Sequence, residues 1–381
     1  MRMQRVEPAN QGLKAFLVVL SLIVLSITLS AGLWPFSFHQ GNNVNWIVDR
    51  AGLHFGDHGM IVSRGKFEGL RTVATKGCSL ELWVEPALSS GSSTILSFYN
   101  PQSPSRVQLQ QSLDDLAFIH ARRPPYNRSN QQSVFLDHVL KKGQKILITL
   151  AYAIGVLDVY LDGSLRKSTR SVEMPCVDFA GTLIVGNTPY RDASWTGIVY
   201  GLAFYDHGLR AGEVVENFRK WKNNRDDSSG DDAKPYSLYL FNERNGTIVH
   251  DFGTAGIDLE IPKYYFLLHP GFLVPFWREF RPSLHYVKDV AINIFGLVPL
   301  GFCFAALFAW VMGRKRNLMY TMAASFCVSL TIEVLQAFIP IRLSGTTDLI
   351  TNTSGGALGA WLYLNKYTQT WLERWALIRT T

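Results

Sequence analysis

The chain has 381 residues, of which 47% are apolar and only 18% are charged. This length allows two domains, and the clustering of the apolar residues into long runs is typical of a membrane protein. The formal net charge of +7 comes largely from basic residues that flank these runs. No nucleic-acid-binding motif accompanies the charge, so we expect no nucleic-acid partner.

About 20 consecutive apolar residues are needed to cross a bilayer core. Four apolar stretches are candidates by this measure. Residues 15–34 and 290–312 carry no charge, and residues 318–341 carry only Glu333. The fourth stretch, residues 349–364, is short and rich in small polar residues, so it must lean on neighbouring helices. The alternative for the first stretch is a cleaved signal peptide ending near Ser30–Gly32, but its length favours an uncleaved anchor.

Basic residues beside these stretches predict how the chain is oriented. They form three clusters: Arg2, Arg5 and Lys14 before the first stretch, Arg314–Arg316 between the second and third, and Lys366, Arg374 and Arg379 after the fourth. With four spans all three clusters fall on one side, which the positive-inside rule makes cytoplasmic. We therefore expect a multi-pass protein of the cell (inner) membrane with both termini cytoplasmic and residues 35–285 outside.

The periodicity of the chain changes between residues 45 and 262, where short segments alternate apolar and polar residues. Turn-forming residues separate these segments, which is the pattern of a two-sheet antiparallel sandwich. A single helix is expected, at residues 209–221. The predicted strands are residues 79–85, 93–99, 107–112, 145–152, 156–163, 181–187 and 196–206, and residues 236–253 are expected to close the sandwich.

Two of the four cysteines fall in the predicted exported segment. Cys78 and Cys176 are its only pair, and an oxidising compartment would allow them to form a disulfide. The alternative is two separate buried thiols. Cys303 and Cys327 lie in predicted spans, where cysteines usually pack as small apolar residues.

Several of the strand segments also carry a resemblance. GLHF (52–55), ELWVEP (81–86), VYLDG (159–163), LIVGN (183–187) and WTGIVYGLAFYDHGLRAGEV (195–214) resemble the laminin G, or concanavalin A-like, jelly-roll superfamily. The resemblance implies glycan binding, sometimes through calcium, with Trp83, Tyr190 and Trp195 as candidates for stacking on sugar rings. Aromatic residues on such strands are more often core, and no acidic set has a calcium-loop spacing, so no metal site is predicted.

The polar residues of the predicted spans fall at similar depth near the outer surface. Glu333 lies in the outer half of the third span, at about 1.5 Å per residue, with Gln336 one turn beyond it. The predicted binding set is Asp289, Asn293, Glu333, Gln336, Arg342, Asp348 and Asn352. An ionised carboxylate in hydrocarbon costs roughly 2.5 to 3.5 kcal/mol on insertion scales, so these groups should face inward. They form either a ligand, ion or proton site, or polar contacts that only join helices.

The same polar positions resemble a known membrane family. The VanZ-like family is matched by Asp289, Asn293, Pro299-Leu300-Gly301, Ser329-Leu330-Thr331-Ile332-Glu333, Gln336, Pro340, Arg342, Asp348, Asn352-Thr353, Gly355 and Gly359, and by Trp34–Phe38 after the first span. The family takes its name from a protein linked to teicoplanin resistance, and some relatives accompany exopolysaccharide export. The resemblance implies a VanZ-like core into which the sandwich is inserted.

Together these patterns predict a multi-domain protein: a four-span α-helical membrane bundle with an inserted all-β jelly-roll sandwich. The predicted parts are the N-terminus and first span (1–40), the sandwich (41–262), an aromatic interfacial segment (263–285), spans two to four (286–366) and a cytoplasmic tail (367–381).

The preferred functional hypothesis is an envelope protein that binds rather than catalyses. The sandwich would recognise a glycan, an envelope polysaccharide or another envelope partner, and the polar set would hold a small polar or lipid head group, with Arg342 pairing with an anion. The alternative is a membrane enzyme acting on a lipid-linked saccharide, with Glu333 as general base and Asp348 as acid. In a third hypothesis the spans merely anchor the sandwich. The sequence indicates no cofactor.

Overall fold

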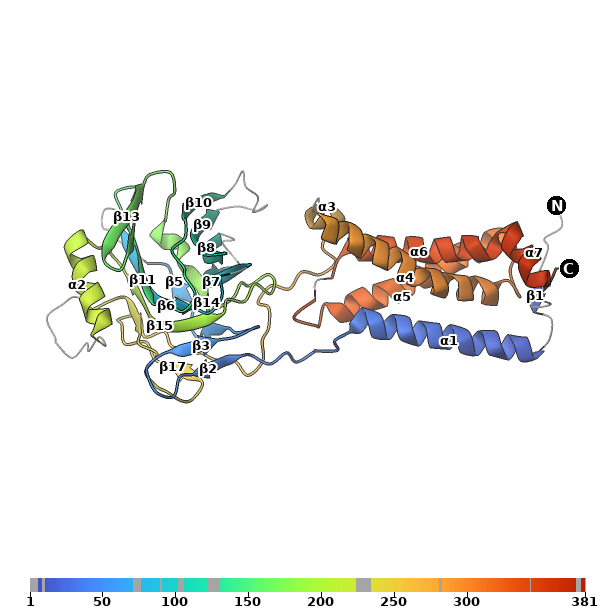
Figure 1. The fold of residues 1–381 in the computed structure, drawn as a ribbon, viewed down its shortest axis with the longest axis horizontal. Coiled ribbons are helices and arrows are strands. Elements are labelled where there is room, and N and C mark those ends of the chain that lie inside the picture. The colour runs from blue at the N-terminus through green and yellow to red at the C-terminus, as the bar shows by residue number, and fades with distance from the viewer. Residues whose placement is uncertain are drawn as a thin grey trace. The chain divides into compact units, whose positions relative to one another are not determined.

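The computed structural model describes residues 6–8, 11–70, 77–89, 91–101, 106–121, 131–223, 234–280, 283–342, 344–374 and 378–380. Arg2 and Arg5, used above for orientation, lie outside these residues. The chain forms two compact units, residues 39–269 and residues 1–38 with 270–381. The first unit consists mainly of β-strands and the second mainly of helices (Figure 1).

The unit of residues 39–269 is a sandwich of two antiparallel sheets, as the alternating pattern predicted. One sheet has the order β10 (Gln132–Leu136), β9 (Asp115–Ala121), β8 (Arg106–Ser112), β7 (Ser92–Tyr99), β14 (Ala180–Val185), β4 (Ile61–Ser63), β18 (Leu259–Glu260), β17 (Ile248–Val249), with β5 (Phe67–Glu68) beside β14. The other has the order β13 (Ser164–Thr169), β12 (Val156–Leu161), β11 (Ile146–Ala153), β6 (Cys78–Pro86), β15 (Gly197–Tyr205), β3 (Leu53–Phe55), β2 (Val44–Trp46), with β16 (Ser237–Tyr239) beside β15.

The core lies between the two sheets and contains the apolar residues of the alternating segments. On β6, Leu80, Leu82 and Val84 are buried in this core, while Glu81 and Trp83 point to the other face of the sheet. The seven predicted strands are confirmed within a few residues, but β9, β10 and β13 were missed. Strand β13 is almost entirely exposed, so it lacks the apolar alternation on which the prediction depended.

A disulfide joins Cys78, at the start of β6, to Cys176 in the short 3₁₀ helix Cys176–Asp178, and their Cα atoms lie 5.8 Å apart. It links two segments separated by 98 residues in the sequence. Such a cross-link restricts the unfolded chain more than a short-range one would.

Helix α2 (Ala211–Lys222) confirms the predicted helix and packs on the outer face of the second sheet. Beneath it lies Glu81, whose side chain is fully buried. Its carboxylate accepts hydrogen bonds from Tyr205 Oη (2.8 Å), Trp221 Nε1 (2.9 Å) and Asn217 Nδ2 (3.1 Å). A buried carboxylate is tolerated when several donors surround it in this way, so Glu81 ties β6, β15 and α2 together.

The helical unit contains α1 (Gln11–Leu33), α3 (Phe276–Glu279), α4 (Leu284–Phe308), α5 (Arg314–Gln336), α6 (Thr346–Leu364) and α7 (Lys366–Arg374), with β1 (Val6–Pro8) paired to β19 (Ile378–Thr380). Helices α1, α4, α5 and α6 run side by side (Figure 1). Three helical segments of the described chain are long and apolar enough to cross a membrane: Gln11–Leu33, Tyr286–Phe308 and Arg314–Gln336.

The prediction of four spans is therefore corrected to three by length and composition. Helix α6 forms where the fourth span was expected, but it is not among the three candidates. The residues TTDLITNTSGG at its start place hydroxyls, amides, one carboxylate and glycines where a lipid-facing helix has long apolar side chains. Its buried face instead packs against α4 and α5.

Replacing Glu81 should destabilise the sandwich. In Glu81→Ala, three buried donors lose their acceptor, so we expect the free energy of unfolding to fall by about 3 to 5 kcal/mol. Thermal unfolding of the full-length protein, followed by tryptophan fluorescence, would measure the loss. The control is Glu216→Ala, which removes an exposed glutamate from α2, the helix that covers Glu81. An equal loss of stability in the two variants would contradict the role given to Glu81.

Candidate functional site

The backbones of α4 and α6 touch, because glycines lie where the two helices cross. A Cβ atom at Gly355 would lie 2.1 Å from the Ile294 carbonyl oxygen, and one at Gly359 would lie 2.1 Å from that of Val298. On the α4 side, a Cβ at Gly301 would lie 2.1 Å from the carbonyl oxygen of Gly356. Small residues at such crossings allow the close packing on which helix association in membranes depends.

Helix α5 buries six polar side chains and exposes several large apolar ones. The buried polar residues are Asn317, Thr321, Ser325, Ser329, Glu333 and Gln336, most of them four residues apart and therefore on one face. The exposed residues include Met319, Met322, Phe326 and Val334. This is the reverse of a helix in water and is the arrangement expected in lipid. Sequence reasoning singled out only the last two of the six as site residues, although the spacing of four was readable.

Contacts of the buried face connect α5 to both neighbouring helices. Asn317 Nδ2 donates to the Ala305 carbonyl oxygen of α4 (2.8 Å), and Asn352 Nδ2 of α6 donates to Ser329 Oγ (3.0 Å). The Asn352 Oδ1 atom is buried and has no hydrogen-bond partner among the described residues. Asn352 therefore joins α5 and α6 through its amide nitrogen.

Glu333 lies near the C-terminal end of α5 on this face and is only 1% exposed. Its Oε2 accepts a hydrogen bond from the backbone N–H of Gly345 (2.8 Å), the residue that precedes the first turn of α6. Unpaired N–H groups and the helix dipole make a helix N-terminus favourable for a carboxylate. The buried acid of α5 therefore caps the beginning of α6.

A second carboxylate reaches the same helix end, and sequence reasoning missed it. Oε2 of Glu279, at the end of α3, accepts from the Thr347 backbone N–H (3.0 Å) and from Thr347 Oγ1 (2.5 Å). A Cβ atom at Gly345 would lie 1.7 Å from Glu279 Oε1, so a larger residue there would require the Glu279 carboxylate to move. An acid inside an aromatic segment expected at the membrane interface was the signal available in the sequence.

Asp348 and Asn293 form the accessible part of the predicted set. Asn293 Nδ2 of α4 donates to Asp348 Oδ1 of α6 at 2.7 Å, and both residues are half-buried. Asp289 is exposed and interacts electrostatically with Asp348, as do Glu279 and Arg342. Two acids and one arginine thus surround the Asp348–Asn293 pair.

Gln336 and Arg342 are directed instead toward the end of α1. Gln336 Nε2 donates to the Gly32 carbonyl oxygen (2.8 Å), while Arg342 Nε and Nη2 donate to that of Trp34 (3.2 and 2.5 Å). The seven predicted residues are thus distributed among the α6 cap, the Asp348–Asn293 pair, the α5–α6 contact and the α1 terminus.

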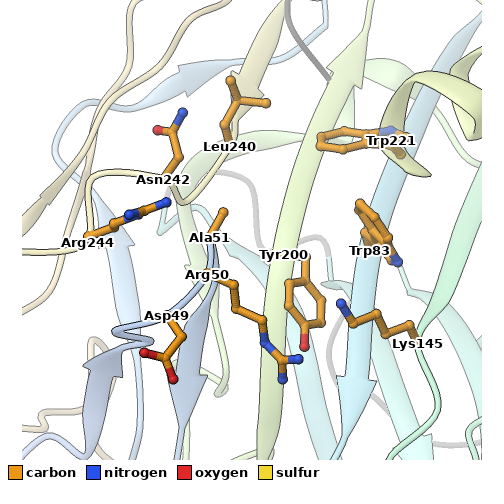
Figure 2. Close-up of a pocket in the computed structure, with 10 residues that line it drawn as sticks. All are labelled: Asp49, Arg50, Ala51, Trp83, Lys145, Tyr200, Trp221, Leu240, Asn242 and Arg244. Atoms are coloured by element: carbon orange, nitrogen blue, oxygen red, sulfur yellow. The ribbon is translucent and has the colours of Figure 1, made fainter. Parts of the chain in front are cut away.

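The three aromatic residues considered for sugar stacking in the sandwich differ in exposure. Trp195 is fully buried and donates through Nε1 to Gln111 Oε1 (2.7 Å), so it belongs to the core. Tyr190 is half-buried and makes edge contacts with Tyr99 and His269. Trp83 is half-buried and lines a cavity of about 360 Å³ (Figure 2).

One group of described residues has the composition of a metal site. Asp114, Asp115 and His138 place their ligand atoms within 4.8 Å of one another on the sandwich surface. His138 Nδ1 hydrogen-bonds to Asp114 Oδ2 (2.8 Å). This hydrogen bond raises the pKa of His138 above its ordinary value, which favours the protonated ring over a metal-binding one.

Comparison with known proteins locates the family signal in the C-terminal part of the chain. The family described as VanZ/LLP1 matches residues 218–368, which include all seven predicted site residues of the helices. The C-terminal part of the chain is thus similar to this family. The match does not extend to α1, and no curated protein matches the chain.

Solved structures with likeness to the chain include a SAP-like pentraxin from Limulus polyphemus (13% identity, TM-score 0.32, 45% of this chain and 79% of that one). Others are a candidate carbohydrate-binding protein from Bacteroides ovatus (12%, 0.38, 55% and 57%) and the receptor-binding domain of botulinum neurotoxin D (12%, 0.36, 56% and 57%). The chain thus spans little more than half of the last two. With TM-scores below 0.5, these likenesses support no conclusion about function.

The helix crossing predicts opposite effects for two glycines. Gly355→Ala should lower the free energy of unfolding by about 1 to 3 kcal/mol, because its methyl group collides with α4 backbone. Gly296→Ala, on an exposed face of α4 where a Cβ meets nothing within 4 Å, should be neutral or stabilising. Thermal unfolding of the two variants in detergent measures these changes in stability. If Gly355→Ala is as stable as the wild type, the close contact between Gly355 and the α4 backbone is refuted.

The capping role of Glu333 predicts a graded response. Glu333→Ala leaves the Gly345 N–H without its acceptor and should cost about 1 to 3 kcal/mol of stability. Glu333→Gln keeps a carbonyl oxygen and should cost less. The control is Thr331→Ala, at an exposed site on the same helix. If thermal unfolding shows that Glu333→Gln loses as much stability as Glu333→Ala, the capping role of Glu333 is contradicted.

Proposed function

We propose that this protein is a multi-pass membrane protein of the cell envelope whose β-sandwich recognises a glycan or another envelope partner. The observation that carries this proposal is the position of the sandwich in the chain. Residues 39–269 fold as one compact unit that follows candidate span α1 and precedes candidate span α4. If α1 and α4 both cross the bilayer, the whole unit lies on one side of it and is presented to one compartment.

The basic segment between α4 and α5 supports an outward orientation. Arg314, Lys315 and Arg316 are all exposed at the start of α5, and such clusters are retained on the cytoplasmic side. The opposite ends of α1 and α4, which flank the sandwich, would then face outward.

The Asp348–Asn293 pair supports a second role for the helical unit, as a site for a small polar or lipid head group. Asp348 is half-buried and Asp289 is exposed, so a group at the membrane surface could reach both. Because Arg342 donates to Trp34 while the acids outnumber it, the site favours a head group with an ammonium rather than the anion first considered.

The structure offers less support for the enzyme alternative. A general base must lie within hydrogen-bond reach of the proton that it removes. Glu333 is 1% exposed, and its Oε2 is engaged by Gly345. We therefore assign Glu333 a structural role and propose binding rather than catalysis.

The test uses polysaccharide, which does not cross membranes. Spheroplasts that express the full-length protein should retain a fluorescent envelope polysaccharide added from outside, beyond the level of spheroplasts with an empty vector. Inside-out vesicles should retain none until detergent opens them. Retention by intact inside-out vesicles would refute the orientation, and no retention by either preparation would refute glycan recognition.

A further inference from the structure

The cavity lined by Trp83 has the features of a built binding site. It lies on the outer face of the second sheet, between the end of α2, the β2–β3 turn and the segment after β16 (Figure 2). Its volume of about 360 Å³ falls in the range of small-molecule sites. The lining residues are Asp49, Arg50, Ala51, Trp83, Lys145, Tyr200, Trp221, Leu240, Asn242 and Arg244.

Three aromatic rings form one wall, and the sheet holds each of them in place. The ring centroid of Trp83 lies 5.7 Å from that of Tyr200 and 6.2 Å from that of Trp221. Tyr200 lies at a bulge, where the β15–β6 register shifts between Val199 and Gly201, and bulges commonly re-aim a side chain. Tyr200 Oη then donates to Glu85 Oε2 (2.6 Å).

Trp221 is positioned equally firmly. Its Nε1 donates to the buried carboxylate of Glu81, and a Cβ atom at Gly201 would lie only 2.2 Å from its ring. Glycine at position 201 therefore lets the indole ring approach the sheet. The aromatic wall is preorganised, which lowers the entropic cost of binding.

Cationic side chains gather over this wall. Lys145 Nζ lies 4.0 Å from the Tyr200 ring centroid and 5.7 Å from that of Trp83, and the Arg50 guanidinium lies 5.4 Å from the same Tyr200 ring. Figure 2 shows Arg50 and Lys145 on either side of the Tyr200 hydroxyl, with Arg244 beside Asn242. Three cations thus line the cavity, and Asp49 is the only acid among the described residues that line it.

Neighbouring acids balance these charges only in part. Glu85 lies 3.9 Å from Arg50 Nη2 and already accepts the Tyr200 hydroxyl. Lys145 makes no salt bridge with a carboxylate among the described residues. Partial burial, and then repulsion by Arg50, lower the pKa of Lys145. An anion placed between Lys145 and Arg50 would relieve that repulsion.

We propose that this cavity binds an acidic saccharide unit, with the sugar ring stacked on Trp83 and its carboxylate between Lys145 and Arg50. Sugar rings have an apolar C–H face that packs on aromatic side chains, and paired cations recognise carboxylates. Asn242 and Asp49 supply an amide and a carboxylate for the hydroxyl groups of the sugar. This inference rests on the proposed glycan recognition and assigns it a location and a ligand class.

The experiment compares two probes that differ only in charge. Full-length protein in detergent is titrated with oligogalacturonate and with the same oligomer after reduction of its carboxylates to alcohols, and tryptophan fluorescence reports binding. We expect at least about tenfold tighter binding of the acidic oligomer, because a hydrogen bond to a charged group is worth more than a neutral one. The preference should shrink as salt rises.

Variants locate the site. Lys145→Gln and Arg50→Gln should each weaken binding of the acidic oligomer about tenfold and leave the thermal midpoint unchanged, whereas Trp83→Leu should weaken both oligomers. The matched control is Lys142→Gln, an exposed lysine three residues from Lys145 that does not line the cavity. Because Lys145 and Arg50 are exposed, their substitution should not disturb folding.

The outcomes separate this inference from the proposed function. Binding of both oligomers with equal affinity, or binding that Lys145→Gln and Arg50→Gln leave intact, would overturn the acidic-saccharide site while glycan recognition stands. An equal loss in Lys142→Gln would also overturn it, because the charge effect would then be general. If the wild-type protein binds neither these oligomers nor the envelope polysaccharide, both proposals fail.

Discussion

Two carboxylates, one buried and one half-buried, join three helices of the helical unit at the start of α6. Glu279 comes from helix α3 and Glu333 from helix α5, yet both accept hydrogen bonds at the start of α6. Gly345, which precedes the first turn, donates to Glu333, and Thr347 donates to Glu279. The first N–H groups of a helix have no partner within the helix and need other acceptors. The carboxylates and the helix end therefore stabilise one another, and at Gly345 the Glu279 carboxylate approaches the backbone closely.

The composition of α6 is unusual. Helix α6 is too polar to be a candidate span by composition because it is rich in threonine and glycine and contains Asn352. These residues contact the buried face of α5 and the backbone of α4. The buried polar and small residues of α6 therefore lie on the face that packs against α4 and α5, while Ile350 and Trp361 are exposed.

The sandwich also contains a buried carboxylate that accepts hydrogen bonds from several elements. Glu81 is fully buried beneath α2 and accepts hydrogen bonds from Tyr205, Asn217 and Trp221. Since Trp221 also lines the cavity of Figure 2, the network that holds α2 on the sheet also shapes the aromatic wall. Stability and the proposed recognition of a ligand are coupled there, because the same hydrogen bonds serve both.

Hydrophobic periodicity in the sequence by itself determined the two-unit organisation, seven strands of the sandwich, helix α2 and the three candidate spans, because these patterns depend on local residue order. The sequence also singled out Glu333, Asp348 and Asn293 as polar residues in apolar surroundings. Only the tertiary structure decided their partners: Glu333 meets Gly345, Arg342 meets Trp34, and Glu279 joins the cluster from a segment with no helical pattern. The cavity beside Trp83 was equally out of reach, since Arg50, Lys145, Tyr200 and Arg244 come from four separate segments. Such convergence depends on how strands and helices pack across long sequence distances, and no local pattern encodes it.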